Sequence, residues 1–259
     1  MLVAGGLIFL TSLFPLAEAW RKNRQSTLAH ALAWAMVAWL AWGCVVLAAL
    51  LEVNGYLIPG RYLALCLLGC TAVAVLGARR PGAAAWNFVV AGLLAVFLLW
   101  LGEGALLGRG VELGPVRTVF LAGGLAIGAV NYLPTRLGPA MLLLAGGCIL
   151  ELRELLRPAV QADLATTTLA FGLAPWLAWL CLRWARAPAA PLDRLWREFR
   201  DRYGLVWGQL VRDQFNRSAA NAGLDVELAW QGLRKPAGDR EEELLVTLQA
   251  LLKRFGTWS

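Results

Sequence analysis

The stretch WRKNRQSTLAHALAWAMVAWLAWGCVVLAALL, residues 20–51, decides the class of fold. It opens with a basic cluster at residues 21–24 and a cap-like Gln25-Ser26-Thr27, and it then has no charged residue from Leu28 to Leu51. As an α-helix these last residues would be roughly 36 Å long, which exceeds the ~30 Å hydrocarbon core of a bilayer. The stretch therefore predicts a transmembrane helix with a basic flank on its N-terminal side.

The rest of the composition agrees with a membrane protein. Of the 259 residues, 59% are hydrophobic and only 16% are charged, whereas a soluble domain carries about 25% charged residues. Long charge-free runs fill residues 1–182, while the remainder reads as an ordinary surface segment. We therefore expect an all-α transmembrane domain at residues 1–184 and a small cytoplasmic α+β tail at residues 185–259. The preference for arginine over lysine, with abundant Ala, Leu and Gly, suggests a bacterial protein.

Seven charge-free runs indicate about seven transmembrane helices. They cover Leu2–Ala19, Leu28–Leu51, Tyr62–Ala78, Ala83–Leu101, Thr118–Thr135, residues 137–150 and Leu164–Leu182. The sixth run is short for a span, so residues 137–157 either form a re-entrant segment or continue as a helix through Glu151 and Glu154.

Basic residues are unevenly divided between the two sets of alternate loops. One set carries eight: Arg21, Lys22, Arg24, Arg79, Arg80, Arg136, Arg183 and Arg186. The opposite set carries five: Arg61, Arg109, Arg117, Arg153 and Arg157. Because cytoplasmic loops carry an excess of Lys and Arg, we expect a multi-pass protein of the bacterial inner membrane with its N-terminus outside and its C-terminus cytoplasmic. The basic residues are then expected to lie at the surface of the lipid bilayer. The net charge of +7 therefore does not indicate a nucleic-acid partner.

The tail should begin with an amphipathic helix from Leu192 to about Ala220. Four aromatic residues share its apolar stripe: Trp196, Phe199, Tyr203 and Trp207. Aromatic rings favour the membrane interface, so we expect these four side chains at the membrane surface or on the cytoplasmic face of the bundle. The alternative is that the stripe packs on a C-terminal helix with a leucine stripe and forms a soluble domain. A short strand is predicted at residues 226–230, and Asp239 with Glu242 resembles a capping box.

Four polar residues inside or beside the predicted spans are candidates for function. His30 and Glu18 lie toward the cytoplasmic side, and Asn87 and Asn131 lie within the fourth and fifth spans. Ionisable groups within spans often mark a site, although hydrogen bonding between helices also explains them. His30 is the only histidine, so no metal or haem ligand set is predicted, and neither a catalytic set nor a cofactor motif occurs. The five cysteines lie in apolar runs and do not predict disulfides.

One segment resembles a known transporter family. Residues 15–27, PLAEAWRKNRQST, followed by a tryptophan-rich helix, resemble the first repeat of PQ-loop and SWEET transporters. The resemblance implies seven spans in two three-helix repeats, with the fourth span as linker and with Pro15 and Pro134 as the repeat prolines. The sequence departs from the family because Leu16 follows Pro15 and no Ser-Thr loop follows Pro134.

Three functions remain open at this point. The first is a non-catalytic membrane protein that anchors or assembles a protein partner through its cytoplasmic tail. The second, implied by the resemblance, is a facilitator of a small solute, which would require polar residues around a midplane cavity. The third is a membrane enzyme that uses His30 with Glu18.

The loop charges generate a topology prediction. In a cysteine-free background, single cysteines at positions 23 and 55 are labelled with a membrane-impermeant maleimide from the outer side. We expect labelling at position 55 and none at position 23, because the basic loop is cytoplasmic. Outer labelling at position 23 would overturn this orientation.

Overall fold

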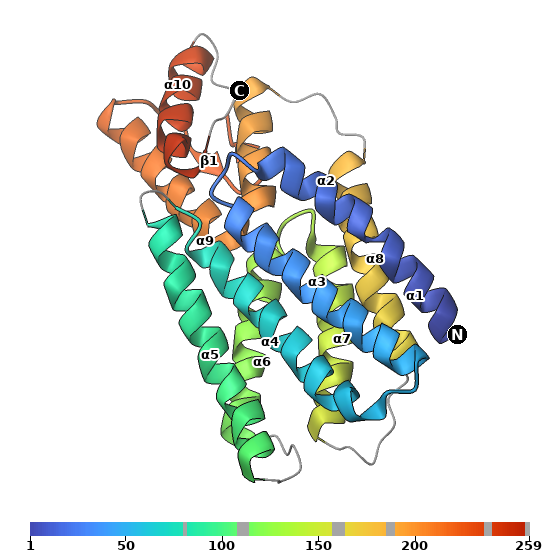
Figure 1. Cartoon of the computed structure of the whole chain (residues 1–259). Helices are drawn as coiled ribbons and strands as arrows, with labels where there is room; N and C mark the ends of the chain where they lie inside the picture. The colour runs from blue at the N-terminus through green and yellow to red at the C-terminus, as the bar shows by residue number, and fades with distance from the viewer. Residues whose placement is uncertain (80–81, 108–113, 157–163, 185–189, 236–239, 257–259) are drawn as a thin grey trace.

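The computed structural model describes residues 1–79, 82–107, 114–156, 164–184, 190–235 and 240–256. Its elements in chain order are α1 Leu2–Thr11, α2 Leu13–Asn23, α3 Ala29–Leu50, η1 Asn54–Tyr56, α4 Leu57–Leu76, α5 Ala83–Leu107, α6 Pro115–Tyr132, α7 Gly138–Leu156, α8 Leu164–Arg183, α9 Pro191–Asn221, β1 Leu228–Ala229, β2 Gly232–Leu233, α10 Glu241–Leu252 and η3 Lys253–Phe255. The predicted all-α class is confirmed, with one small hairpin near the C-terminus (Figure 1).

Five segments of the described chain are long and apolar enough to cross a membrane. They are Leu2–Asn23, Ala29–Leu50, Leu57–Leu76, Ala84–Glu103 and Leu164–Arg183. The chain is therefore a membrane protein with several spans. α6 and α7 are not among the five, although both run beside α4 in the bundle (Figure 1), so the count of seven spans stays a prediction.

Most predicted helix boundaries lie within a few residues of the observed ones. The sixth run does continue as a helix through Glu151 and Glu154, ending at Leu156. The first run divides into α1 and α2 at Ser12, whose hydroxyl donates to the Phe9 carbonyl oxygen at 2.5 Å. The Trp39 indole N–H donates to the same hydroxyl oxygen at 3.0 Å, which attaches this bend to α3.

The same tight turn follows α2 and α6. The backbone N–H of Ser26 donates to the Asn23 carbonyl oxygen at 2.9 Å, and that of Thr135 donates to the Tyr132 carbonyl oxygen at 3.0 Å. Each hydroxyl also accepts from the backbone N–H two residues later, at 3.3 and 3.1 Å. Because the two turns share these hydrogen bonds, we align residue 26 with residue 135 and call residues 1–76 and residues 115–183 the two repeats.

The helix packing follows this repeat. In each repeat the second helix packs on the first and the third, and α1 packs on α8 as α6 packs on α4. The six helices thus form a ring in which the first helix of one repeat contacts the third helix of the other. α5 stands outside the ring beside α4 (Figure 1), and its role as a linker span stays a prediction.

The tail packs on the end of the bundle where these two turns lie, which we call the tail end (Figure 1). α9 contacts α4 and α6, and α10 packs on α9. Trp207 donates its indole N–H to the Val75 carbonyl oxygen at 3.0 Å, and Trp230 donates to the Pro134 carbonyl oxygen at 2.9 Å. The backbone N–H of Thr27 donates to the Phe255 carbonyl oxygen at 3.0 Å. The tail is therefore bonded to both repeats.

The predicted strand is the first half of a hairpin in which Leu228 pairs with Leu233. An ion pair between Lys235 and Asp225, 2.6 Å apart, lies beside it and holds the pKa of the Asp225 carboxyl below its ordinary value. Asp239, the predicted cap of the last helix, lies outside the described residues.

A break in α9 joins the tail to α6. Gly204 has φ +79° inside the helix, a conformation that residues with a side chain rarely adopt. The Asn131 side chain forms hydrogen bonds with backbone groups on both sides of the break. Its Nδ2 donates to the Tyr203 carbonyl oxygen at 3.3 Å, and its Oδ1 accepts from the Val206 N–H at 3.0 Å. Asn131 is only 3% exposed, so this contact stabilises the break away from water.

Gly204→Ala is expected to loosen the tail from the bundle. The new methyl group would strain a left-handed residue, at about 1–3 kcal/mol, and would also collide with the Asn131 side-chain amide. Faster cleavage of the tail by a protease, together with a lower midpoint of thermal unfolding, would measure the effect.

Gly223→Ala is the matched control. Gly223 also has a left-handed φ of +70°, but an added Cβ would meet nothing within 4 Å. It should therefore show only the backbone effect and no change in tail protection. Equal losses in both variants would mean that the Asn131 contact does not hold the tail.

Candidate functional site: an apolar chamber inside the ring

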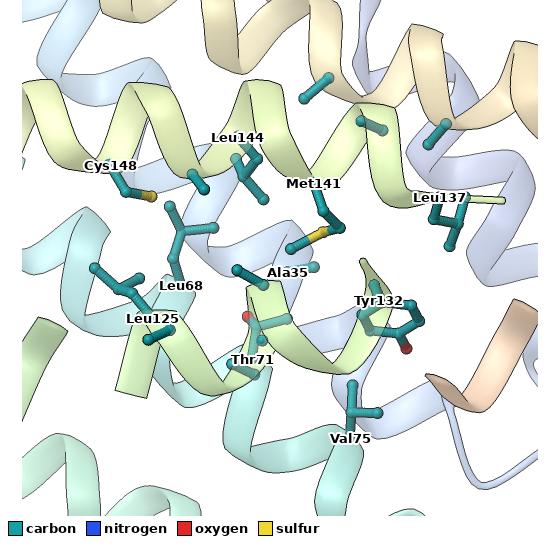
Figure 2. A pocket seen from close by; sticks show the side chains of 18 of the residues that line it. Ala35, Leu68, Thr71, Val75, Leu125, Tyr132, Leu137, Met141, Leu144 and Cys148 are labelled. Carbon is teal, nitrogen blue, oxygen red and sulfur yellow. The ribbon is translucent and has the colours of Figure 1, made fainter. Parts of the chain in front are cut away.

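A cavity of about 530 Å³ lies inside the ring, between α6 and α7 and against α4. Figure 2 shows Met141, Leu144 and Cys148 of α7 facing Leu125 and Tyr132 of α6 across it. Residues of α2, α3 and α8 complete the wall. We call this cavity the chamber.

Small side chains account for the space. α6 lines the chamber with Ala122, Ala126, Gly128 and Ala129, and α7 lines it with Ala140 and Ala145. In a membrane such small residues usually let helices approach closely. Here α6 packs closely on α4, where a Cβ on Gly128 would meet Ala72, while α7 packs closely on α8. Because each helix approaches a different neighbour, the chamber remains between them.

The wall of the chamber offers almost no free polar group. Its two hydroxyl groups both donate within the protein, from Thr71 to the Leu67 carbonyl oxygen at 2.9 Å and from Tyr132 to the Arg202 carbonyl oxygen at 2.9 Å. The Cys148 thiol and the Trp39 ring add little polarity, and the Trp39 N–H is bonded to Ser12. The chamber therefore suits an apolar molecule.

The chamber is elongated along the bundle. Its lining extends from Ala122 to Tyr132 on α6, and from Leu137, directly before α7, to Leu152 on α7. At 1.5 Å per residue these stretches are roughly 15 and 22 Å long. One leaflet of a ~30 Å hydrocarbon core is about 15 Å thick, so the chamber has the length of a lipid chain.

The tail covers one end of the chamber. At this end the Tyr132 hydroxyl donates to the Arg202 carbonyl oxygen of α9. In the turn that follows α6, Arg136 Nε lies 3.5 Å from Asp201 Oδ2 of α9. Arg200 makes a second ion pair with Asp201 at 2.8 Å, and both of these side chains are buried. This network fixes α9 against the end of α6.

The structure brings His30 and Asn87 together but places them away from the chamber. Asn87 Nδ2 and His30 Nδ1 are 3.0 Å apart, and the Trp34 indole N–H donates to Asn87 Oδ1 at 3.4 Å. His30 is exposed on the bundle surface. These hydrogen bonds join α3 to the start of α5. Among the described residues, no cluster of three or more side chains that could bind a metal occurs.

Glu18 belongs to a different group at the tail end, between α2 and α8. Its carboxylate lies 2.6 Å from Lys22 Nζ and 3.0 Å from Arg183 Nη2, and it accepts from the Trp179 indole N–H at 2.6 Å. Lys22 and Arg183 therefore both form ion pairs with this carboxylate. The partners on α8 were not predicted, because nothing in the sequence places α8 beside α2.

The predicted repeat prolines do not occupy equivalent positions. Pro15 is buried in α2 next to the chamber-lining Leu16. Under the equivalence of residues 26 and 135, the counterpart of Pro134 is Gln25. The repeat is therefore carried by the Ser26 and Thr135 turns rather than by the prolines.

The four aromatic residues of the tail helix contact protein in this structure. Trp196, Phe199 and Tyr203 are fully buried and Trp207 is 9% exposed. The ring centroid of Phe255 lies 4.9 Å from those of Phe199 and Tyr203. These side chains thus bind α9 to the C-terminal segment and to the bundle, and contact of the tail with the membrane surface stays a prediction.

Sequence reasoning missed an ion-pair cluster at the end of the bundle opposite the tail. Arg61 of α4 reaches across to the carboxylates of Glu151 and Glu154 on α7. Only the presence of one arginine near the start of the third span could have pointed to this pairing.

Comparison with known protein families, with characterised proteins and with solved structures gives no significant match.

Proposed function

We propose that this membrane protein binds a single apolar chain, such as the acyl or isoprenoid chain of a lipid, in the chamber between α6 and α7. The observation that carries the proposal is the chamber itself. It has a volume of about 530 Å³, within the ~300–1,000 Å³ range of ligand sites, and its wall is apolar along its whole length.

A polar solute fits this wall poorly. The hydroxyl groups of Thr71 and Tyr132 already bond to backbone carbonyl oxygens. A sugar or an amino acid would therefore lose hydrogen bonds with water without replacement, at roughly 1–3 kcal/mol for each polar group. This observation disfavours the small-solute facilitator that the resemblance to PQ-loop and SWEET transporters implies.

The other two functions have less support. An anchoring or assembly role through the tail requires an apolar surface for a protein partner, yet the aromatic stripe of α9 is buried against α10 and the bundle. An enzyme that uses His30 with Glu18 requires the two side chains to meet, yet they lie in separate groups with separate partners.

Filling the chamber should abolish binding. The test uses a fatty acid that carries a photoactivatable diazirine on its chain, added to the protein in nanodiscs, with cross-linked peptides identified by mass spectrometry. We expect cross-links to chamber residues of α6 and α7, such as Met141, and their loss when unlabelled fatty acid competes. Ala145→Phe should lower this labelling at least about tenfold, or about 1.4 kcal/mol, because the ring occupies the space of the chain.

Ala95→Phe is the control. Ala95 is an exposed position on α5 and is not part of the chamber wall, so its substitution should leave labelling unchanged. Labelling spread evenly over the lipid-facing helices and insensitive to competitor would show that the chamber binds no chain.

A further inference from the structure

Two buried carboxylates at the end of the bundle opposite the tail share one guanidinium. Glu151 is bound by Arg61 in a bidentate pair, with Nε to Oε2 at 2.6 Å and Nη2 to Oε1 at 3.0 Å. Glu154 contacts the same Arg61 Nη2 through its Oε2. With both carboxylates ionised, the three side chains would carry a net charge of −1.

Glu154 is not fully satisfied by this contact. It is only 7% exposed, and its Oε1 has no hydrogen-bond partner among the described residues. A buried oxygen without a partner in a folded protein usually indicates a bound ion, a water or a proton. The missing partner of Glu154 therefore points to a ligand that is positively charged or that donates a hydrogen bond.

A second buried oxygen without a partner lies on the facing helix. Thr167 of α8 is fully buried and its Oγ1 has no hydrogen-bond partner among the described residues. α7 and α8 run antiparallel, and a Cβ on Gly147 would meet Ala170 at 3.4 Å. Because Gly147, Glu151 and Glu154 are spaced i, i+4, i+7, they share one face of α7, and Thr167 stands at about the level of Glu151.

No second cation is described beside the two carboxylates. On α4 the ionisable neighbours of Arg61 are Tyr62 and Cys66. On α7 they are Cys148 and the exposed Arg153, and the described part of α8 carries its only charge, Arg183, at the tail end. Arg117 of α6 forms an ion pair with Glu103 of α5 at 2.6 Å. The α-amino group of Met1 and Glu52 are exposed.

We propose that Glu154 is a proton-binding site, in which the carboxyl group holds one proton at neutral pH while Glu151 remains ionised in its bidentate pair with Arg61. The O–H bond forms on Glu154 Oε1, which then becomes a hydrogen-bond donor. The proton comes from water at this end of the bundle and returns there on release. Binding makes the three side chains neutral together, which removes the cost of a buried negative charge that has no partner among the described residues.

This site goes beyond the proposed binding of an apolar chain and is independent of it. The two sites share only α7, which lines the chamber with Cys148 and Leu152 and carries the two carboxylates on an adjacent face. Loss of proton binding would leave the proposal for the chamber intact, and loss of chain binding would leave the proton site intact.

Infrared spectroscopy of the full-length protein in nanodiscs tests the proposal. At pH 7 the wild-type protein should show the C=O stretch of one protonated carboxyl group per chain, shifted in D₂O. Glu154→Gln should remove this band. Glu151→Gln should also remove it, because Arg61 is then free to pair with an ionised Glu154. Glu103→Gln is the control, since Glu103 is exposed and paired with Arg117, and it should retain the band.

The wild-type spectrum alone can overturn the proposal, whatever the variants do. Absence of a protonated carboxyl band at pH 7 would show that both carboxylates are ionised. A carboxylate band that shifts with Na⁺ but not with pH would show that the site takes a metal cation rather than a proton. A protonated band that survives in Glu154→Gln would assign the proton to another residue.

Discussion

The hydrogen bonds of Asn131 across the break in α9 are the contact on which the closed tail end depends. A helix that is broken inside a packed structure leaves backbone groups without partners, and each of these would be costly away from water. Asn131 offers a donor and an acceptor to the two sides of the break at Gly204. Since Asn131 lies on α6, the break can form only where α9 meets the end of the bundle. The tail is thereby built into the membrane domain, and its aromatic side chains face protein.

The two parallel repeats explain why a chamber exists above this closed end. The first helix of each repeat packs on the third helix of the other, so six helices form a ring rather than a solid bundle. On one side of the ring, Trp42 of α3 and Phe171 of α8 fill the interior with an edge-to-face contact 4.7 Å between centroids. On the other side, α6 and α7 line the chamber with several small residues: Ala122, Ala126, Gly128, Ala129, Ala140 and Ala145. This difference in side-chain size between the two sides of the ring creates the space.

The sequence predicted well those features that depend on local composition. The long charge-free runs located the helices within a few residues, and the i, i+3, i+4 stripe located α9, because both patterns reflect a single helix. It could not predict the features that depend on which helices become neighbours. Arg61 was assigned to a loop and its pairing with Glu151 was not predicted, since nothing local reveals that α4 and α7 meet. Asn131 stood out as a polar residue within a span, but its partner in the tail could not be predicted, and Gly204 gave no signal, because each acquires its role only from the other.

The proposed binding of one apolar chain in the chamber can be followed directly through the methyl groups of the methionines. The chain contains three methionines, Met1, Met36 and Met141, of which Met141 lines the chamber. In protein with ¹³C-labelled methionine methyls, a spin-labelled fatty acid is titrated into the nanodiscs and the methyl signals are followed by NMR. We expect the Met141 signal to broaden strongly and the effect to saturate near one equivalent per chain. Broadening of Met141 that is no stronger than that of Met1, or that grows in proportion to the probe without saturating, would contradict the proposed binding.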